Sequence, residues 1–328
     1  MTDRLAVAFA VEAGPGVGLG HLRRAQALGA VLRARGTAVR VLVDGEADAA
    51  ASGTVPVAWT RDPALACRAL AESRPDAVVV DSYRAAPELF ERLRTVTGCV
   101  VAIDDLADRP LPVHFVVNGA IHAARLPYRG APDTRFLLGP EYALLDPAFA
   151  EEPAEAPRER VARVLVALGG ATDGAAIGAA AAAVRRALPD AALDLAVGPF
   201  SPAPAEAPEG ASMHRGLRSL RDLLRKADLA VTGGGITLYE GLASGTPVVG
   251  LCLAANQRAN VEELCAAGII LGGAPSLEAA LRRATGDPAL RRALSARGRR
   301  LVGGRGASRV ADEVARACAA TGRQRSAR

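Results

Sequence analysis

Short apolar runs alternate with helix-like segments along the whole chain of 328 residues, and this alternation constrains the fold more than any other feature. Such alternation is typical of βαβ units, in which helices cover both faces of a parallel sheet. Helices are predicted at residues 22–35, 175–188, 217–226 and 236–242. Strands are predicted at residues 5–11, 39–43, 77–80, 100–103, 115–117, 161–168, 193–197, 229–231 and 248–251.

The pattern breaks between residues 124 and 160, where Pro147, Pro153 and Pro157 prevent a continuous helix. We expect this segment to connect two domains of similar size. The sequence therefore predicts an α/β protein with an N-terminal domain of residues 1–150 and a C-terminal domain of residues 151–328.

Composition excludes several classes of protein. Half of the residues are hydrophobic and 23% are charged, which is too apolar for a disordered chain. The net charge of +5 comes from basic residues interleaved with acidic ones, so no nucleic-acid partner is expected. No apolar run approaches the about 18 residues that cross a bilayer, so no membrane span and a cytoplasmic location are expected. The cysteines are odd in number and widely spaced, which predicts reduced thiols at Cys67, Cys99, Cys252, Cys265 and Cys318.

The first candidate site is a glycine-rich turn between the first predicted strand and the first predicted helix. Gly18 and Gly20 let the backbone approach a ligand closely, and the helix start favours an anion or an electron-rich oxygen. His21 stands where a dinucleotide-binding turn has its third glycine, so that fingerprint is absent. An imidazole at this place can take a proton from a hydroxyl or a water, and we predict His21 as the general base. A helix cap is the alternative role.

The second candidate site is the glycine turn after the strand at residues 229–231. Amides around Gly233, Gly234, Gly235 and Thr237 can hold a diphosphate without a lysine. Glu240, one turn into the helix, is predicted to reach a ribose hydroxyl, although an acidic residue is also ordinary in a first helical turn.

Further candidates follow other strands. Asn256 and Gln257 follow the strand at residues 248–251 and are predicted to hold sugar hydroxyls, with a helix cap as the alternative for Asn256. Gly169 follows the strand at residues 161–168 and is a candidate wall of the nucleotide pocket, although a tight turn explains it equally well. The same reasoning makes candidates of residues 81–83 and of Asp104 and Asp105, with one acidic residue of each set a helix cap or turn former.

Motifs in both halves resemble the nucleotide-sugar enzymes of the GT-B superfamily. Within it they resemble the UDP-sugar hydrolases of pseudaminic acid biosynthesis and their spore-coat-polysaccharide relatives. The resemblance spans nearly the whole chain and rests on residues 18–24, 80–83, 103–107, 142–149, 227–240, 255–257 and 304–310.

The resemblance implies two Rossmann-like domains with parallel sheets facing across a cleft, and neither a cofactor nor a metal. It implies that His21 activates water to displace the diphosphate of a UDP-linked amino or deoxy sugar with inversion, while Gly18, Gly20, Arg24, Tyr83, Asn256 and Gln257 contact the substrate. Departures from that family around Ile236 and Tyr239 leave open a glycosyltransferase that uses a small-molecule or cell-envelope acceptor. A protein that binds a sugar nucleotide without catalysis is a second alternative. The sequence leaves the oligomeric state open.

Overall fold

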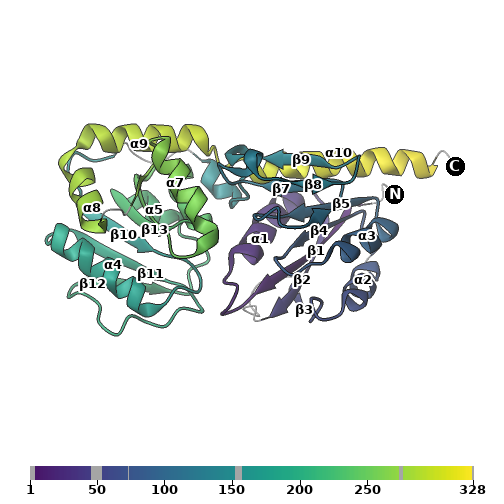
Figure 1. The fold of residues 1–328 in the computed structure, drawn as a ribbon, viewed down its shortest axis with the longest axis horizontal. Helices are drawn as coiled ribbons and strands as arrows, with labels where there is room; N and C mark the ends of the chain where they lie inside the picture. The colour runs from purple at the N-terminus through teal and green to yellow at the C-terminus, as the bar shows by residue number, and fades with distance from the viewer. Residues whose placement is uncertain (1–3, 46–53, 73, 152–156, 273–275, 327–328) are drawn as a thin grey trace. The chain divides into compact units, whose positions relative to one another are not determined.

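The computed structural model describes residues 4–45, 54–72, 74–151, 157–272 and 276–326 (Figure 1). The chain divides into two compact α/β units. Unit 1 comprises residues 1–147 and 305–328, and unit 2 comprises residues 148–304. Each unit has its own parallel sheet and its own apolar core.

The main sheet of unit 1 has the strand order β3-β2-β1-β4-β5-β7-β9, and all of its described strands run parallel. Five of them lie at predicted positions, whereas the short β3 and the edge strand β9 are not among the predictions. The strands are β1 (Ala6–Ala13), β2 (Ala38–Gly45), β3 (Thr54–Pro56), β4 (Ala77–Asp81), β5 (Cys99–Ile103), β7 (Phe115–Asn118) and β9 (Arg135–Leu138), with a separate pair β6 (Pro110–Leu111) and β8 (Arg129–Gly130).

Successive side chains of each strand point to opposite faces of the sheet, so unit 1 has a core on each face. Val7 and Phe9 of β1 pack with apolar residues of α1 and α10, and Ala8 and Ala10 pack with those of α2 and α3. The helices are α1 (Gly20–Ala34), α2 (Pro63–Ala71), α3 (Pro87–Val96) and α10 (Gly306–Ser326), with 3-10 turns at Ala123–Arg125 and Pro140–Tyr142.

The sheet of unit 2 has the parallel order β12-β11-β10-β13-β14-β15. Counted from β10, this is the order 3-2-1-4-5-6 of the dinucleotide-binding Rossmann fold. The predicted helix at residues 217–226 is shorter in the structure, because residues 217–220 are not helical. The elements are β10 (Arg163–Ala167), α4 (Gly174–Ala187), β11 (Ala192–Val197), β12 (Ala211–Arg215), α5 (Arg221–Lys226), β13 (Leu229–Gly233), α6 (Ile236–Ala243), β14 (Val248–Leu251), α7 (Arg258–Ala266), β15 (Leu271–Gly272), α8 (Leu277–Gly286) and α9 (Pro288–Leu301), with 3-10 turns at Pro147–Ala150 and Ala255–Gln257.

The C-terminal helix α10 belongs to unit 1, which differs from the predicted C-terminal domain of residues 151–328. Val310 and Val314 of α10 pack into the same apolar cluster as α1. Gly306 permits this return, because a Cβ at that position would collide with the carbonyl oxygen of Ala143. The prediction assumed that each domain is one continuous stretch of sequence, so it placed α10 in the C-terminal domain rather than in unit 1.

The predicted connection at residues 124–160 also differs from the structure. Residues 124–147 belong to unit 1, where β9 pairs with β7 at the edge of the sheet. The prolines interrupt helices but do not prevent these residues from packing. Pro153 lies outside the described residues.

Candidate functional site

Both sheets contain a topological switch point, where the connections from two neighbouring strands leave in opposite directions. Ligands of open α/β sheets bind beyond the carboxyl ends of the strands at this point. In unit 1 it lies between β1 and β4, and in unit 2 it lies between β10 and β13. Several predicted site residues end or follow one of these four strands: Gly233 is the last residue of β13, and the others are Gly18 to Arg24, Tyr83, Gly169, Gly234 and Gly235.

The first glycine turn brings the chain from β1 into α1. Gly14 and Gly18 form a closed turn, in which the amide of Gly18 donates to the carbonyl of Gly14 at 2.7 Å. Gly18 has a φ of 80°, which other residues rarely adopt. Gly20 begins the helix, and a Cβ there would meet no atom within 4 Å. His21 and Arg24 consequently lie on one face of the first turn of α1.

His21 is paired with a carboxylate that the sequence placed only among the candidates after β4. The Nδ1 atom of His21 contacts Oδ1 of Asp81, the last residue of β4. The two residues are 2% and 0% exposed. Burial alone would raise the pKa of the Asp81 carboxyl, but Arg24 and His21 hold this pKa below its usual value. Asp81 is therefore an ionised acceptor.

An ionised Asp81 decides which nitrogen of the His21 ring carries the proton. A carboxylate only accepts hydrogen bonds, so Nδ1 must donate to Asp81. Nη2 of Arg24, which lies 3.0 Å from Nδ1, gives its proton to Asp81 Oδ1 at 2.7 Å instead. With Nδ1 as the donor, Nε2 is the nitrogen left to accept a proton, and it has no hydrogen-bond partner among the described residues. This is the tautomer that a general base requires.

Arg24 bonds to two carboxylates of unit 1, which was not predicted. Its Nε donates to Asp81 Oδ2 at 2.8 Å, and its Nη1 donates to both oxygens of Asp105 at 2.9 and 2.7 Å. Burial alone would lower the pKa of the guanidinium, but Asp105 and Asp81 raise this pKa well above its ordinary value. All three nitrogens of Arg24 are thus engaged within unit 1. A direct contact of Arg24 with substrate stays a prediction.

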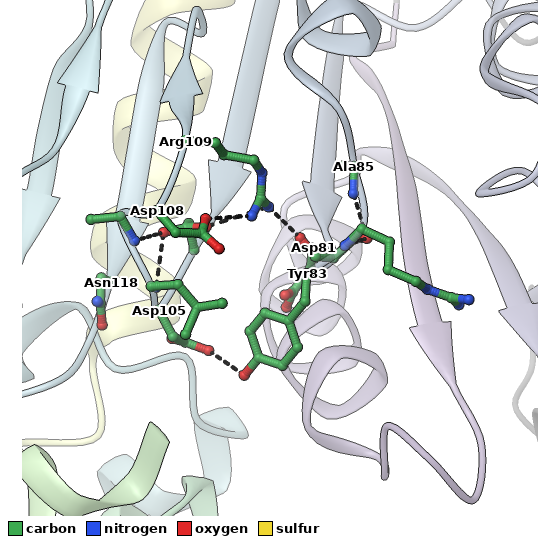
Figure 2. Close-up of polar contacts among 12 residues, drawn as sticks. Asp81, Tyr83, Ala85, Asp105, Asp108, Arg109 and Asn118 are labelled. Carbon is green, nitrogen blue, oxygen red and sulfur yellow. Dashed lines mark hydrogen bonds and ion pairs between the residues drawn. The ribbon is translucent and has the colours of Figure 1, made fainter. Parts of the chain in front are cut away.

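Tyr83 connects the other end of this network to His21. Its hydroxyl donates to Asp105 Oδ2 at 3.0 Å, as Figure 2 shows, and its ring meets the His21 ring edge-on at a centroid distance of 4.6 Å. Burial and the Asp105 carboxylate raise the pKa of the Tyr83 hydroxyl, which keeps its proton. Tyr83 is 36% exposed, the most exposed member of the network. It is therefore the side chain best placed to meet a ligand directly.

Asp104 forms a turn, which is the alternative role that the sequence allowed for one of the two acidic residues after β5. Its Oδ1 accepts hydrogen bonds from the amides of Leu106 and Ala107, and Ala107 has a φ of 53°. Arg109 lies 3.4 Å from Oδ2 and donates to the carbonyl of Ser82 (Figure 2). Burial raises the pKa of the Asp104 carboxyl. Asp104 thus shapes the turn that presents Asp105.

The phosphate candidates of unit 2 are backbone groups. Gly233 ends β13, and Gly235 is the N-cap of α6 without a side-chain cap. The first amides of a helix have no partner within the helix, so this start retains unsatisfied donors. A Cβ at Gly235 would meet no atom within 4 Å. Gly169, which follows β10 with a φ of 130°, forms the second turn at this switch point.

Gln257 supports this glycine turn. Its Oε1 accepts hydrogen bonds from the amides of Gly234 at 3.0 Å and Leu253 at 3.2 Å. Asn260 donates to the carbonyl of Gly234 at 2.8 Å and accepts from the Tyr239 hydroxyl at 2.6 Å. A Cβ on Gly234 would lie 2.7 Å from Val261 and 2.9 Å from the Cβ of Gln257, so this glycine is required by packing.

The remaining candidates of unit 2 differ in their accessibility. Thr237 and Glu240 are buried in α6, with 8% and 7% of each residue exposed. Asn256 is exposed in the 3-10 turn before α7, and the N-cap of α7 is Gln257, without a side-chain cap. Their contacts with a ribose or a sugar stay predictions.

Among the described residues, no group of three or more His, Cys, Asp or Glu side chains is arranged to hold a metal ion. Within the same residues, no helix combines the length and the apolar character needed to cross a membrane.

Comparisons with known proteins identify the fold. No protein-family model matches the chain. Its sequence is similar to the spore coat polysaccharide biosynthesis protein SpsG of Bacillus subtilis strain 168, with 26% identity over 262 residues that cover 74% of this chain and 77% of SpsG. Its structure is similar to spinosyn forosaminyltransferase SpnP, with a TM-score of 0.64 and 17% identity over 95% of this chain and 100% of SpnP. The fold is that of the GT-B glycosyltransferases.

A further GT-B structure was solved with a nucleotide. The glycosyltransferase SsfS6 of Streptomyces sp. SF2575, in complex with thymidine diphosphate, has a TM-score of 0.57 and 17% identity over 95% of this chain and 98% of SsfS6. The predicted GT-B-like fold of two Rossmann-like domains and the predicted similarity to spore-coat-polysaccharide proteins are confirmed. A pseudaminic acid hydrolase is not among these similar proteins, so that part of the resemblance stays a prediction.

Proposed function

We propose that this protein is a glycosyltransferase that moves a sugar from a nucleoside diphosphate to an acceptor hydroxyl. The observation that carries the proposal is the His21 ring, whose Nδ1 is held by ionised Asp81 and whose Nε2 is left as the acceptor. A side chain so arranged takes a proton from a hydroxyl as that hydroxyl attacks.

In the proposed reaction, Nε2 of His21 removes the acceptor proton while the acceptor oxygen forms a bond to the anomeric carbon. The bond from that carbon to the diphosphate breaks, and attack from the opposite side inverts the configuration. The imidazolium that forms is stabilised by the negative charge of Asp81, whose ionised state is secured by Arg24. Asp81 is a positioning residue in this mechanism, and His21 is the catalytic base.

We assign the diphosphate to the turn of unit 2 that contains Gly233, Gly234 and Gly235. Amides at the start of α6 donate hydrogen bonds to phosphate oxygens, and the helix dipole favours their negative charge. Negative charge increases on the diphosphate as the sugar leaves, so the same amides stabilise the transition state more than the ground state. Gln257 contributes indirectly, because it holds the amide of Gly234 in place.

The comparisons support transfer to an acceptor more than the cleavage by water that the resemblance implied. SpnP and SsfS6 are glycosyltransferases by name, and SpsG is named for polysaccharide biosynthesis. The nucleotide of SsfS6 is thymidine diphosphate, whereas the sequence motifs predict a UDP-sugar. Both nucleotides therefore belong in the test.

The test incubates the purified protein with UDP-linked and dTDP-linked amino and deoxy sugars in water enriched in oxygen-18. Each donor is tested alone and with a hydroxyl acceptor, for which glycerol, a methyl glycoside and a simple phenol serve as probes. Mass spectrometry follows the nucleoside diphosphate, the free sugar and the acceptor. We expect release of the diphosphate to rise with acceptor, and a glycoside without oxygen-18 at its anomeric position.

Two other outcomes contradict the proposal. A free sugar with oxygen-18 at the anomeric carbon, formed equally fast with and without acceptor, makes the protein a hydrolase. Tight binding of UDP or dTDP without turnover of any donor makes it a binding protein.

A further inference from the structure

Two cysteines of unit 1 lie near the amino ends of strands β4 and β5, which is the end of the sheet opposite His21. Cys99 is the first residue of β5 and is fully buried. It pairs in register with Ala77, the first residue of the neighbouring strand β4. His21 and Asp81 lie instead at the carboxyl ends of β1 and β4. Chemistry at Cys99 is thus separated from the candidate active site by the length of the strands.

Cys318 reaches this place from α10. Its Sγ donates to the carbonyl of Asp76, the residue directly before β4, at 3.7 Å. Cys318 and Cys99 also belong to one apolar cluster. Asp76 directly precedes Ala77, the residue that pairs in register with Cys99, so the contact with Asp76 places Cys318 beside Cys99. Residues 219 positions apart in the chain therefore form a thiol pair.

The two thiols differ in pKa and in exposure, and this difference makes Cys318 the first to react with an oxidant. The neighbouring Cys99 thiol lowers the pKa of the Cys318 thiol, whereas the Cys318 thiol, together with burial, raises the pKa of the Cys99 thiol. Cys318 is also the more accessible, with 9% of the residue exposed against none of Cys99. The thiolate is the reactive form of cysteine, so an oxidant attacks Cys318 first.

We propose that Cys99 and Cys318 are a modification site that forms a reversible disulfide with a hydroperoxide as oxidant. The Cys318 thiolate attacks the O–O bond, takes one oxygen as a sulfenic acid and releases an alcohol or water. The sulfur of Cys99 then attacks the Cys318 sulfur, which expels the hydroxyl group as water as Cys99 loses its proton. The two sulfurs give up two electrons in total, and the hydroperoxide accepts them.

The disulfide joins the terminal helix α10 to the central part of the unit 1 sheet. The loop that it closes contains all of unit 2, because residues 148–304 lie between the two cysteines. Closing a loop of this length removes many conformations from the unfolded chain, so the oxidised protein resists unfolding more than the reduced protein. This inference does not depend on the proposed sugar transfer.

The test uses the full-length chain with the substitution Cys252→Ser, because Cys252 is exposed and would form bonds between molecules. The protein is treated with hydrogen peroxide, alkylated and digested with trypsin without reduction. Cleavage after arginine, but not before Pro110, places Cys99 on residues 95–125 and Cys318 on residues 317–323. We expect these two peptides to be joined with the loss of two hydrogens, and dithiothreitol to separate them.

Matched variants decide whether the bond has the predicted origin. Adding Cys318→Ser should abolish the joined peptides, whereas adding Cys67→Ser should leave them unchanged. Urea unfolding should occur at a higher midpoint for the oxidised than for the reduced Cys252→Ser protein, and this difference should vanish with Cys318→Ser. The proposal is overturned if both thiols of the peroxide-treated protein are still alkylated once that protein is unfolded in urea without a reductant. It is equally overturned if Cys318 proceeds to a sulfinic acid while Cys99 stays free.

Discussion

The two units place different chemistry at the same position of the same kind of sheet. At its switch point, unit 1 has a network of ionisable side chains that runs from His21 through Asp81, Arg24 and Asp105 to Tyr83. Unit 2 has glycines and backbone amides there, supported by the neutral side chains of Gln257 and Asn260. The topology thus gives both units a candidate site at the same place, and the residue types give the two sites different chemistry.

The difference follows from what each task demands. A proton acceptor needs one defined tautomer, and the ionised Asp81, which can only accept a hydrogen bond, imposes it on His21. A diphosphate needs several donors at close range, and glycine allows the backbone itself to supply them. Changes in unit 1 should therefore affect the chemical step, and changes in the unit 2 turn should affect nucleotide affinity.

The largest effect is expected from His21→Ala. Loss of the general base should lower kcat of the donor reaction by about two to four orders of magnitude. The affinity for UDP, measured by calorimetry, should stay within about twofold, because unit 2 supplies the assigned phosphate donors. A variant that keeps wild-type turnover would remove His21 from the mechanism. An equal loss of affinity and turnover would break the proposed division between the units.

The second largest effect is expected from Arg24→Met, and it should appear in stability. This change leaves the Asp81 and Asp105 carboxylates without their shared cation, and breaking such a buried ion pair costs about 3 kcal/mol. The free energy of unfolding in urea at pH 7 measures the loss. Arg33→Met, an exposed change on the same helix, is the matched control and should cost less than about 0.5 kcal/mol.

The pH dependence sharpens this prediction. The pKa of Asp81 is lower in the folded than in the unfolded protein, so the stability that it contributes is complete above the unfolded value of about 4. That stability is lost as the pH falls through the lower folded value. The difference between wild type and Arg24→Met should therefore be largest at neutral pH and should shrink below about pH 4. A difference that is constant with pH would mean that Arg24 acts by packing alone.

The sequence predicted the features that depend on neighbouring residues. Apolar runs that alternate with helix-like segments located β1, β4 and β10. A parallel strand that is buried on both faces needs such a continuous apolar run. The glycine turns before α1 and α6 were also visible, since the need for close backbone approach is a local property. These features sufficed to predict two α/β domains with parallel sheets and the candidate loops after their strands, and the family resemblance implied that both domains are Rossmann-like.

The partners of the site residues were not predictable in the same way. Asp81 lies 60 positions from His21, and nothing in its own surroundings distinguishes it from Asp104, which forms a turn. The resemblance implied that Arg24 contacts the substrate, and no local pattern shows that the carboxylates of Asp81 and Asp105 converge on it. The return of α10 to unit 1 escaped prediction for the same reason. A signal was available at Gly306, a glycine that the close contact with Ala143 requires.

The smallest effect, and the most specific to unit 2, is expected from Gly235→Val. A side chain at Gly235 meets open space in the protein, so the fold should tolerate it, whereas it would intrude on a diphosphate at the start of α6. We expect the affinity for UDP to fall about tenfold, or about 1.4 kcal/mol, with an unchanged urea midpoint. Gly303→Val, at another glycine with open surroundings, should leave both unchanged. Gly234 is the wrong position for this test, because bulk there collides with Val261 and would lower stability whether or not a phosphate binds. If Gly235→Val binds UDP as tightly as wild type, the diphosphate does not lie at this turn, and the contrast between a charged unit and a backbone-lined unit loses its functional meaning.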